Sequence, residues 1–173
     1  MKKICSWRRK EMDESGPQAV SGEEPISHGI CPDCIRQIST HRKKDLRTYL
    51  DHFDFPVFLV DSNVGIITAN KKGFSVLRKK PEEVEGRLGG DAFDCKYAAL
   101  PGGCGKTIHC KSCAIRLTVT DTYRTGKSHE KVPAYPDLNS ITGETRIQFL
   151  ISTEKNGDAV LLQIDEIAEE KKE

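Results

Sequence analysis

The apolar positions that begin at residue 42 follow the spacing of a helix. Leu46, Tyr49, Leu50 and Phe53 recur at i, i+3, i+4 and i+7, which predicts a short amphipathic helix that ends before Pro56. The apolar face of that helix has two possible uses, which the pattern leaves open. It packs on the chain's own sheet, or it serves as a dimer or partner surface.

Strand patterns follow on both sides of the middle of the chain. Residues 57–60 are a continuous apolar run bounded by turn residues, which predicts a buried strand, and residues 65–70 read as its hairpin partner. Asn156-Gly157 is a strong hairpin turn signal between two later runs. Three further strands are predicted at 130–135, 145–151 and 159–164.

Helical patterns occupy the region between these two groups of strands. Pro81 and the two glutamates after it suit the first turn of a short helix within residues 71–88. Residues 112–125 predict a longer helix that Gly126 ends, although their β-branched content also favours strand. Glycines make residues 86–105 the least regular part, and the charged residues 165–173 predict a solvated helix or a frayed end.

The order of these elements predicts the fold class and the domain organisation. A helix, two strands, short helices, one longer helix and three strands indicate an α+β fold with a five-stranded antiparallel sheet and the helices on one side. Residues 1–41 contain too few large apolar residues for a core of their own. We therefore expect a small cysteine-containing segment at 1–41, one main domain at 42–167 and a charged tail at 168–173.

The composition limits the kinds of molecule that the protein is expected to bind and the cellular compartment in which it is expected to lie. The 173 residues carry 27 basic and 26 acidic side chains, so no global field favours nucleic acid or anionic lipid. No apolar run approaches the roughly 20 residues that span a bilayer, and the N-terminus lacks a signal peptide pattern. We expect a cytoplasmic protein with no membrane partner, where seven cysteines indicate metal binding or redox sensing rather than disulfides.

Three segments of the main domain resemble the PAS family of sensory domains. Residues 54–61 and 65–70 resemble the opening hairpin of PAS domains, and residues 77–86 resemble the family's short helix with its glutamate-containing turn and glycine. The resemblance implies a PAS fold and a role in bacterial signal transduction rather than catalysis, so no enzyme is expected. It also implies output through a signalling protein in trans, such as a histidine kinase or response regulator, or through a homodimer.

Four cysteines lie together in the irregular part of this domain, and they are similar to a four-cysteine insertion found in some bacterial PAS sensors. Thiolates favour Zn²⁺ and iron–sulfur clusters, and a C-x-x-C pair lets two sulfurs meet one metal. Zinc would pin the loop, whereas a [4Fe-4S] cluster would make the domain a sensor of oxygen or redox state. Both remain open, and the expected ligands are Cys95, Cys104, Cys110 and Cys113.

Several polar residues flank these cysteines. Lys106, Lys111 and Arg116 are expected to lower the pKa of the thiols and to donate to sulfur. His109 is expected to be an exposed loop residue rather than a ligand.

A second group of candidate ligands lies in the N-terminal segment. Residues 4–6 and 27–34 resemble a short cysteine-rich segment that accompanies bacterial two-component proteins. Arg8 occupies the place of that segment's second cysteine, which predicts a degenerate metal module. Its candidate ligands are Cys5, His28, Cys31 and Cys34.

Two other classes of protein use cysteines in comparable patterns. A thiol redox protein would use Cys110 and Cys113, but a thioredoxin-like enzyme needs this pair at the end of a strand in a βαβ unit, and here a glycine loop precedes it. A zinc-ribbon nucleic-acid binder would need a basic excess that the chain lacks. The preferred hypothesis is a module that binds a metal or cluster through four cysteines and signals by protein contacts.

Overall fold

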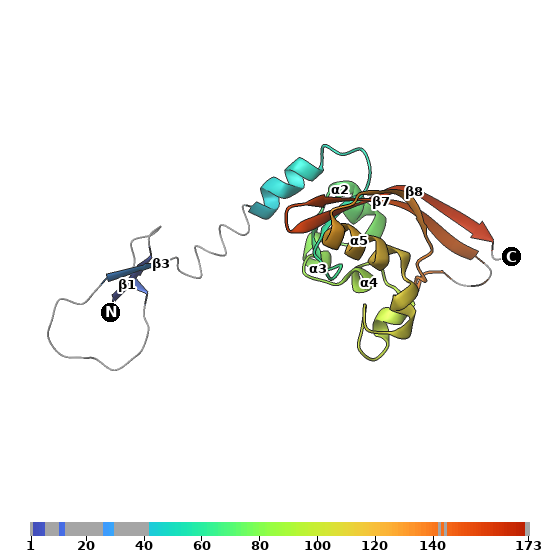
Figure 1. The fold of residues 1–173 in the computed structure, drawn as a ribbon, viewed down its shortest axis with the longest axis horizontal. Coiled ribbons are helices and arrows are strands. Elements are labelled where there is room, and N and C mark those ends of the chain that lie inside the picture. Colours follow the sequence, from blue (N-terminus) through green and yellow to red (C-terminus); the bar gives the residue numbers. More distant parts are fainter. Residues whose placement is uncertain are drawn as a thin grey trace. The chain divides into compact units, whose positions relative to one another are not determined.

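The chain folds into two compact units, Met1–Asp45 and Leu46–Glu173. The computed structural model describes residues 2–5, 11–12, 26–29, 42–141, 143 and 145–171. Figure 1 colours these segments along the sequence.

The first unit contains a small sheet of three strands, β1 (Lys2–Cys5), β2 (Glu11–Met12) and β3 (Ile26–Gly29), in the order β2-β1-β3. Strand β1 is antiparallel to β2 and parallel to β3. The parallel register pairs Ile4 with His28 and Cys5 with Gly29, so the backbones of two candidate ligands lie on neighbouring rungs of one ladder. Cys31 and Cys34 lie outside the described residues.

The second unit is built on an antiparallel sheet of five strands in the order β5-β4-β8-β7-β6, which confirms the predicted fold class. The strands are β4 (Val57–Val60), β5 (Ile66–Ala69), β6 (His129–Ala134), β7 (Thr145–Asn156) and β8 (Ala159–Lys171). Between β5 and β6 lie α2 (Lys71–Leu77), α3 (Pro81–Val84), α4 (Gly89–Ala92), η1 (Lys96–Ala99), η2 (Ile108–Ser112) and α5 (Ala114–Thr125).

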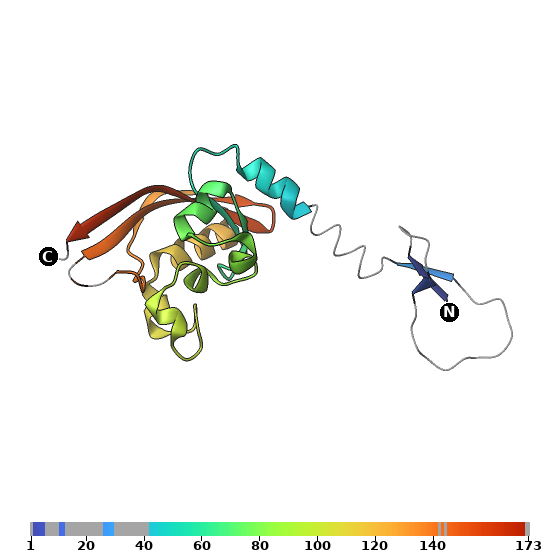
Figure 2. The ribbon, with the colours of Figure 1, turned by 180° about the vertical axis from the view of Figure 1, so that it is seen from behind.

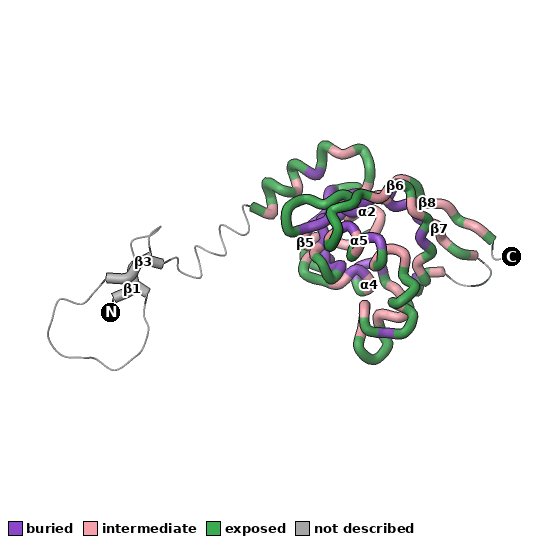
Figure 3. Tube along the Cα trace, viewed as in Figure 1, coloured by how far each residue is buried: buried purple, intermediate pink, exposed green. Residues whose placement is uncertain are grey.

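Strand β4 lies between β5 and β8 and is buried on both faces. Because side chains alternate along a strand, Phe58 and Val60 enter one apolar cluster while Val57 and Leu59 enter another on the opposite face. The larger cluster takes apolar side chains from α2, α3, α4 and α5, and Figures 1 and 2 show these helices gathered on one side of the sheet. The buried positions follow the sheet and the helix surfaces that face it (Figure 3).

The helix over residues 42–50 divides its apolar face between core and solvent. Leu50 is buried against Val57 and Leu59, and Phe53 packs on the same cluster. Tyr49, in contrast, leaves 55 % of its surface exposed. Of the predicted apolar face, Leu50 and Phe53 therefore pack on the chain's own sheet, while Tyr49 remains exposed to solvent.

Local stop and start signals act where the sequence predicted them. Pro81 opens α3, with two glutamates in its first turn. Gly126 ends α5 in the left-handed region at φ 76°, and its N–H donates to the carbonyl of Thr122. Gly157, also at positive φ, lies in the turn that joins β7 to β8.

The expectation of a solvated helix or frayed end at residues 165–173 was wrong as far as Lys171. Strand β8 continues to Lys171 and pairs along its whole length with β7, which itself extends beyond the predicted 145–151. Arg146 faces Glu170 across this ladder and donates two hydrogen bonds to its Oε2, at 3.0 and 2.9 Å. Strand β7 thus supplies hydrogen-bond partners for the backbone of this charged segment, which the segment could not provide for itself.

Among the described residues, the helices are too short or too polar for any of them to cross a bilayer.

Asn70 joins four segments of the main unit through its side chain. The buried amide oxygen accepts hydrogen bonds from the N–H groups of Val57, at 3.0 Å, and Gly73, at 2.8 Å. Its amide nitrogen donates to the carbonyls of Phe55, at 2.7 Å, and Leu50, at 3.2 Å. One side chain therefore caps α2 and secures both the start of β4 and the end of the helix over residues 42–50.

We expect Asn70→Ala to lower the free energy of unfolding by about 3 kcal/mol, because it leaves buried donors and acceptors without partners. Urea unfolding measures the change. The matched control Asn139→Ala removes an exposed asparagine side chain and should change stability by less than about 0.5 kcal/mol. Equal effects of the two substitutions would contradict the joining role of Asn70.

Candidate metal centre

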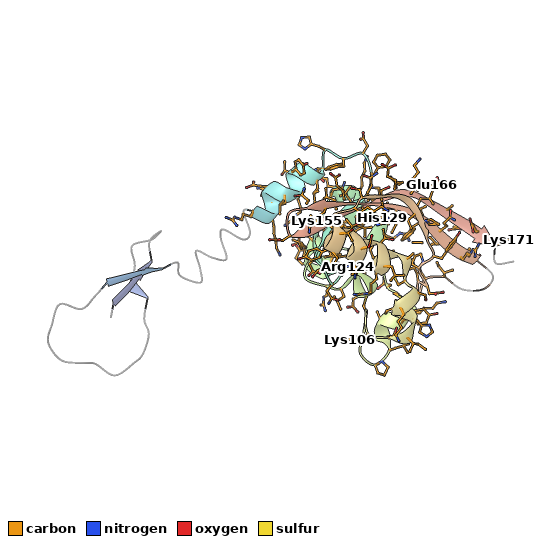
Figure 4. The ribbon with its side chains drawn as sticks, viewed as in Figure 1. Lys106, Arg124, His129, Lys155, Glu166 and Lys171 are labelled. Atoms are coloured by element: carbon orange, nitrogen blue, oxygen red, sulfur yellow. The ribbon has the colours of Figure 1, made fainter. Side chains whose placement is uncertain are left out.

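The four cysteines of the main unit line one cavity of about 300 Å³. The cavity is bounded on its sheet side by apolar side chains such as Val60, Ile66 and Leu162. Its other wall is the cysteine lobe, residues 95–113, which projects from the helices in Figure 1 and carries the labelled Lys106 in Figure 4. The cysteines on this cavity are Cys95, Cys104, Cys110 and Cys113.

Short helices and a glycine loop place these cysteines. Cys95 immediately precedes η1, Cys110 lies within η2, and Cys113 stands between η2 and α5. Cys104 lies in the loop between the two 3₁₀ helices. The structure therefore brings together the four residues that the sequence predicted as one group, and it places them all on the cavity wall.

The sulfur of Cys104 has two donors. The N–H of Gly90 donates to it at 3.2 Å, and the guanidinium of Arg116 lies 3.5 Å away. A side chain at position 90 would be impossible without a shift, because its Cβ would lie 2.8 Å from this sulfur. Gly90 thus lets the first turn of α4 approach the sulfur closely.

The sulfur of Cys110 is also surrounded by hydrogen-bonding groups. The N–H of Gly105 donates to it at 3.1 Å, and the hydroxyl of Thr107 lies 3.2 Å away. Thr107 is the buried polar residue of the lobe. Hydrogen bonds of this kind stabilise a thiolate more than a thiol.

These surroundings move the thiol pKa values in opposite directions. Burial raises the pKa of Cys110, but hydrogen bonds from Thr107 and Gly105 and the charge of Arg116 outweigh it and lower the pKa below the usual value. Burial also raises the pKa of Cys95, where the backbone N–H groups of the next turn offset only part of the effect and the charges of Cys113 and Cys104 add to it. Cys110 is therefore the thiol with the greater thiolate character of the two.

The four cysteine side chains are chemically suited to bind a metal ion or an iron–sulfur cluster. Their sulfur atoms, as placed in the structure, do not surround a single ion. Four thiols on one cavity, two of them already accepting backbone N–H bonds, form a set that iron–sulfur clusters and zinc both use. In the part of the chain that the structure describes, no three His, Cys, Asp or Glu side chains converge closely enough to hold a single metal ion.

Of the three cationic side chains predicted near the sulfurs, Arg116 contacts one directly, while Lys106 and Lys111 are exposed. His109 is exposed, as predicted, but it lies within η2 rather than in a loop and lines the same cavity as the cysteines. Its ring stacks on that of Tyr97 at a centroid distance of 3.8 Å. Sequence reasoning missed Thr107, although its position three residues before Cys110 is the spacing that one 3₁₀ turn brings together.

A comparison with solved structures found PAS domains and other sensory domains at low sequence identity. Solved structures with a similar fold include the Cronobacter turicensis RpfR quorum-sensing receptor PAS domain in complex with BDSF, at 17% identity and TM-score 0.46, covering 65% of this chain and 92% of that one. A Rhodobacter sphaeroides LOV protein matches at 13% identity and TM-score 0.48, covering 74% and 66%. A domain of a sensory box sensor histidine kinase/response regulator from Geobacter sulfurreducens matches at 9% and 0.47, covering 73% and 96%.

No protein-family model matches the chain, and no curated protein matches it. The main unit has the predicted element order and five-stranded antiparallel sheet. Helices α2 to α5 lie on one face of that sheet, whereas the helix over residues 42–50 packs against the other face.

The opposite pKa shifts predict different thiol reactivities in metal-free protein. Because the thiolate is the reactive form, alkylation of Cys110 should reach half of its maximal rate at a lower pH than alkylation of Cys95. Iodoacetamide labelling across pH, read by mass spectrometry, gives both midpoints independently of access. Thr107→Val should raise the midpoint of Cys110, whereas Thr120→Val, at an exposed position, should not. Identical midpoints for the two cysteines would contradict the assignment.

Proposed function

We propose that this chain is a PAS-type sensory module that binds a [4Fe-4S] cluster through Cys95, Cys104, Cys110 and Cys113 and passes the state of the cluster to a protein partner. The observation that carries the proposal is that all four thiols line one cavity of the PAS-like unit.

The spacing of the thiols favours a cluster over a single zinc ion. Zinc in a structural site needs four ligands in a tetrahedron, with sulfur at about 2.3 Å from the metal. The described cysteines do not converge in that way. Thiolates that bind different iron atoms of a cluster stay further apart around the group, which suits ligands spread over a cavity wall.

The surrounding residues have defined roles in such a site. A bound cluster would supply one-electron chemistry and sensitivity to oxygen. The N–H groups of Gly90 and Gly105 would continue to donate to cysteine sulfur, which tunes the electron density on the ligands. Arg116 would place a positive charge beside the anionic thiolates.

Signalling would proceed through contact with another protein, either a histidine kinase or response regulator or a second copy of the chain. The cysteine lobe offers exposed apolar side chains for such a contact. Ile108 leaves 76 % of its surface exposed and Leu100 leaves 42 %. Both lie within a few residues of a proposed ligand, so a partner seated there would be sensitive to the state of the site.

Metal and acid-labile sulfide analysis of anaerobically purified protein, with an optical spectrum, tests the proposal. We expect iron and sulfide in equal amounts. Replacing the four cysteines of the cavity together by serine should lower the iron content by at least about tenfold, because ligand loss costs more than loss of a supporting group. Ser128→Ala, at an exposed position that does not line the cavity, is the control and should keep the wild-type content.

The single variant Cys113→Ser, at an exposed position, guards against misfolding of the fourfold variant and should also lose iron. Far-UV circular dichroism reports the fold of each variant. If the analysis finds zinc and no sulfide, the cluster is ruled out and the site is a structural zinc site. Neither metal, with every thiol titratable, would contradict metal binding and leave Cys110 and Cys113 as a thiol redox pair.

A further inference from the structure

The turn between β4 and β5, residues 61–65, is held in an unusual backbone conformation. Val64 has φ 62°, a region that a β-branched residue adopts only at a cost, and it is buried on the wall of the cysteine cavity. Asp61 Oδ1 accepts hydrogen bonds from the N–H groups of Asn63 and Gly65, both at 2.8 Å. The carbonyl of Val64 accepts from the N–H of Gly89 at 2.8 Å. Contacts around the turn therefore maintain its shape.

Arg116 lies near the start of α5, 53 residues after Asn63 in the sequence, and its side chain hydrogen-bonds to the β4–β5 turn at that residue. Its Nη1 donates to Asn63 Oδ1 at 3.0 Å, and its Nη2 donates to the Asn63 carbonyl at 3.1 Å. The same Nη2 lies 3.5 Å from the sulfur of Cys104. One guanidinium group thus joins a proposed ligand to the residue that precedes Val64.

The absence of a side chain at Gly105, in the cysteine lobe, leaves room for the guanidinium of Arg116. Gly105 has φ 88°, and a Cβ at that position would collide with Arg116 Nη2. A side chain there would displace the guanidinium from both Cys104 and Asn63. The fork geometry of arginine matters as well, because lysine has a single nitrogen and cannot serve three acceptors with a fixed planar array of donors.

We propose that Arg116 is a positioning residue that couples the state of the Cys104 sulfur to the β4–β5 turn. The proposal rests on the proposed function for its signal, since a sulfur bound to a cluster carries the negative charge that holds Nη2. Loss of that charge weakens, without abolishing, the hydrogen bond from Nη2 to the sulfur, and so weakens the hold of Arg116 on Asn63. The turn then opens more often, and the change reaches β4, the strand that ends immediately before Asp61.

Hydrogen exchange at the amides of Asn63, Val64 and Gly65 tests this coupling, because these N–H groups donate within the turn. In wild-type protein we expect exchange about tenfold slower with the cluster loaded anaerobically than without it, the size of effect of one charge-assisted hydrogen bond. In Arg116→Gln the exchange should be fast in both states. Arg124→Gln, on the same helix but paired with Asp121, is the matched control and should behave as wild type.

Unchanged exchange at Leu162 in the sheet core shows that a variant is folded. Arg116→Lys should restore the charge without restoring slow exchange at the turn, because it lacks the fork that reaches Asn63. A cluster-dependent difference that persists in Arg116→Gln would overturn the coupling.

Failure of cluster binding would leave the coupling testable in metal-free protein. Cys104→Ala removes the sulfur acceptor and should speed exchange at the turn, and the double variant with Arg116→Gln should be no faster than Arg116→Gln alone. Additive effects, or no effect of Cys104→Ala, would overturn the coupling whatever the metal content.

Discussion

The burial of strand β4 on both faces is the constraint on which the main unit depends. Its four residues pair with β5 on one side and β8 on the other, and they supply two separate apolar clusters in alternation. A slip of one residue would exchange the two faces and place each side chain in the wrong cluster. Asn70 opposes such a slip, because its side-chain oxygen accepts a hydrogen bond from the N–H of Val57, the first residue of the strand.

The cysteine lobe is organised on a different principle from the sheet. Residues 95–113 bury little of their apolar surface, and Ile108 and Leu100 face solvent. Hydrogen bonds to sulfur, short 3₁₀ turns and glycines at positive φ give the lobe its shape. A segment with a small apolar core takes much of its stability from whatever its polar groups bind, so an occupant of the cavity would have a large influence on the lobe.

The candidate site was predictable as a set of residues but not as an arrangement. Cysteine clustering and the C-x-x-C pair indicated the four thiols, and the cationic residues nearby indicated a donor to sulfur. Which cation makes that contact depended on the fold, because Arg116 meets Cys104 only when α5 packs beside the glycine loop. The hydroxyl of Thr107 and the N–H of Gly90 gave no distinctive signal, since common residues acquire such roles from their neighbours in space.

The amino-acid sequence by itself determined the order and type of the elements in the main unit. Helical and strand periodicities, Pro81 at a helix start, Gly126 at a helix end and the Asn156-Gly157 turn act within a few residues, so they are legible along the chain. Only the tertiary structure decided the length of β8, the division of the apolar face at residues 46–53 and the placement of four cysteines on the wall of one cavity. Each of these depends on contacts between segments far apart in the sequence, whose energies no local pattern contains.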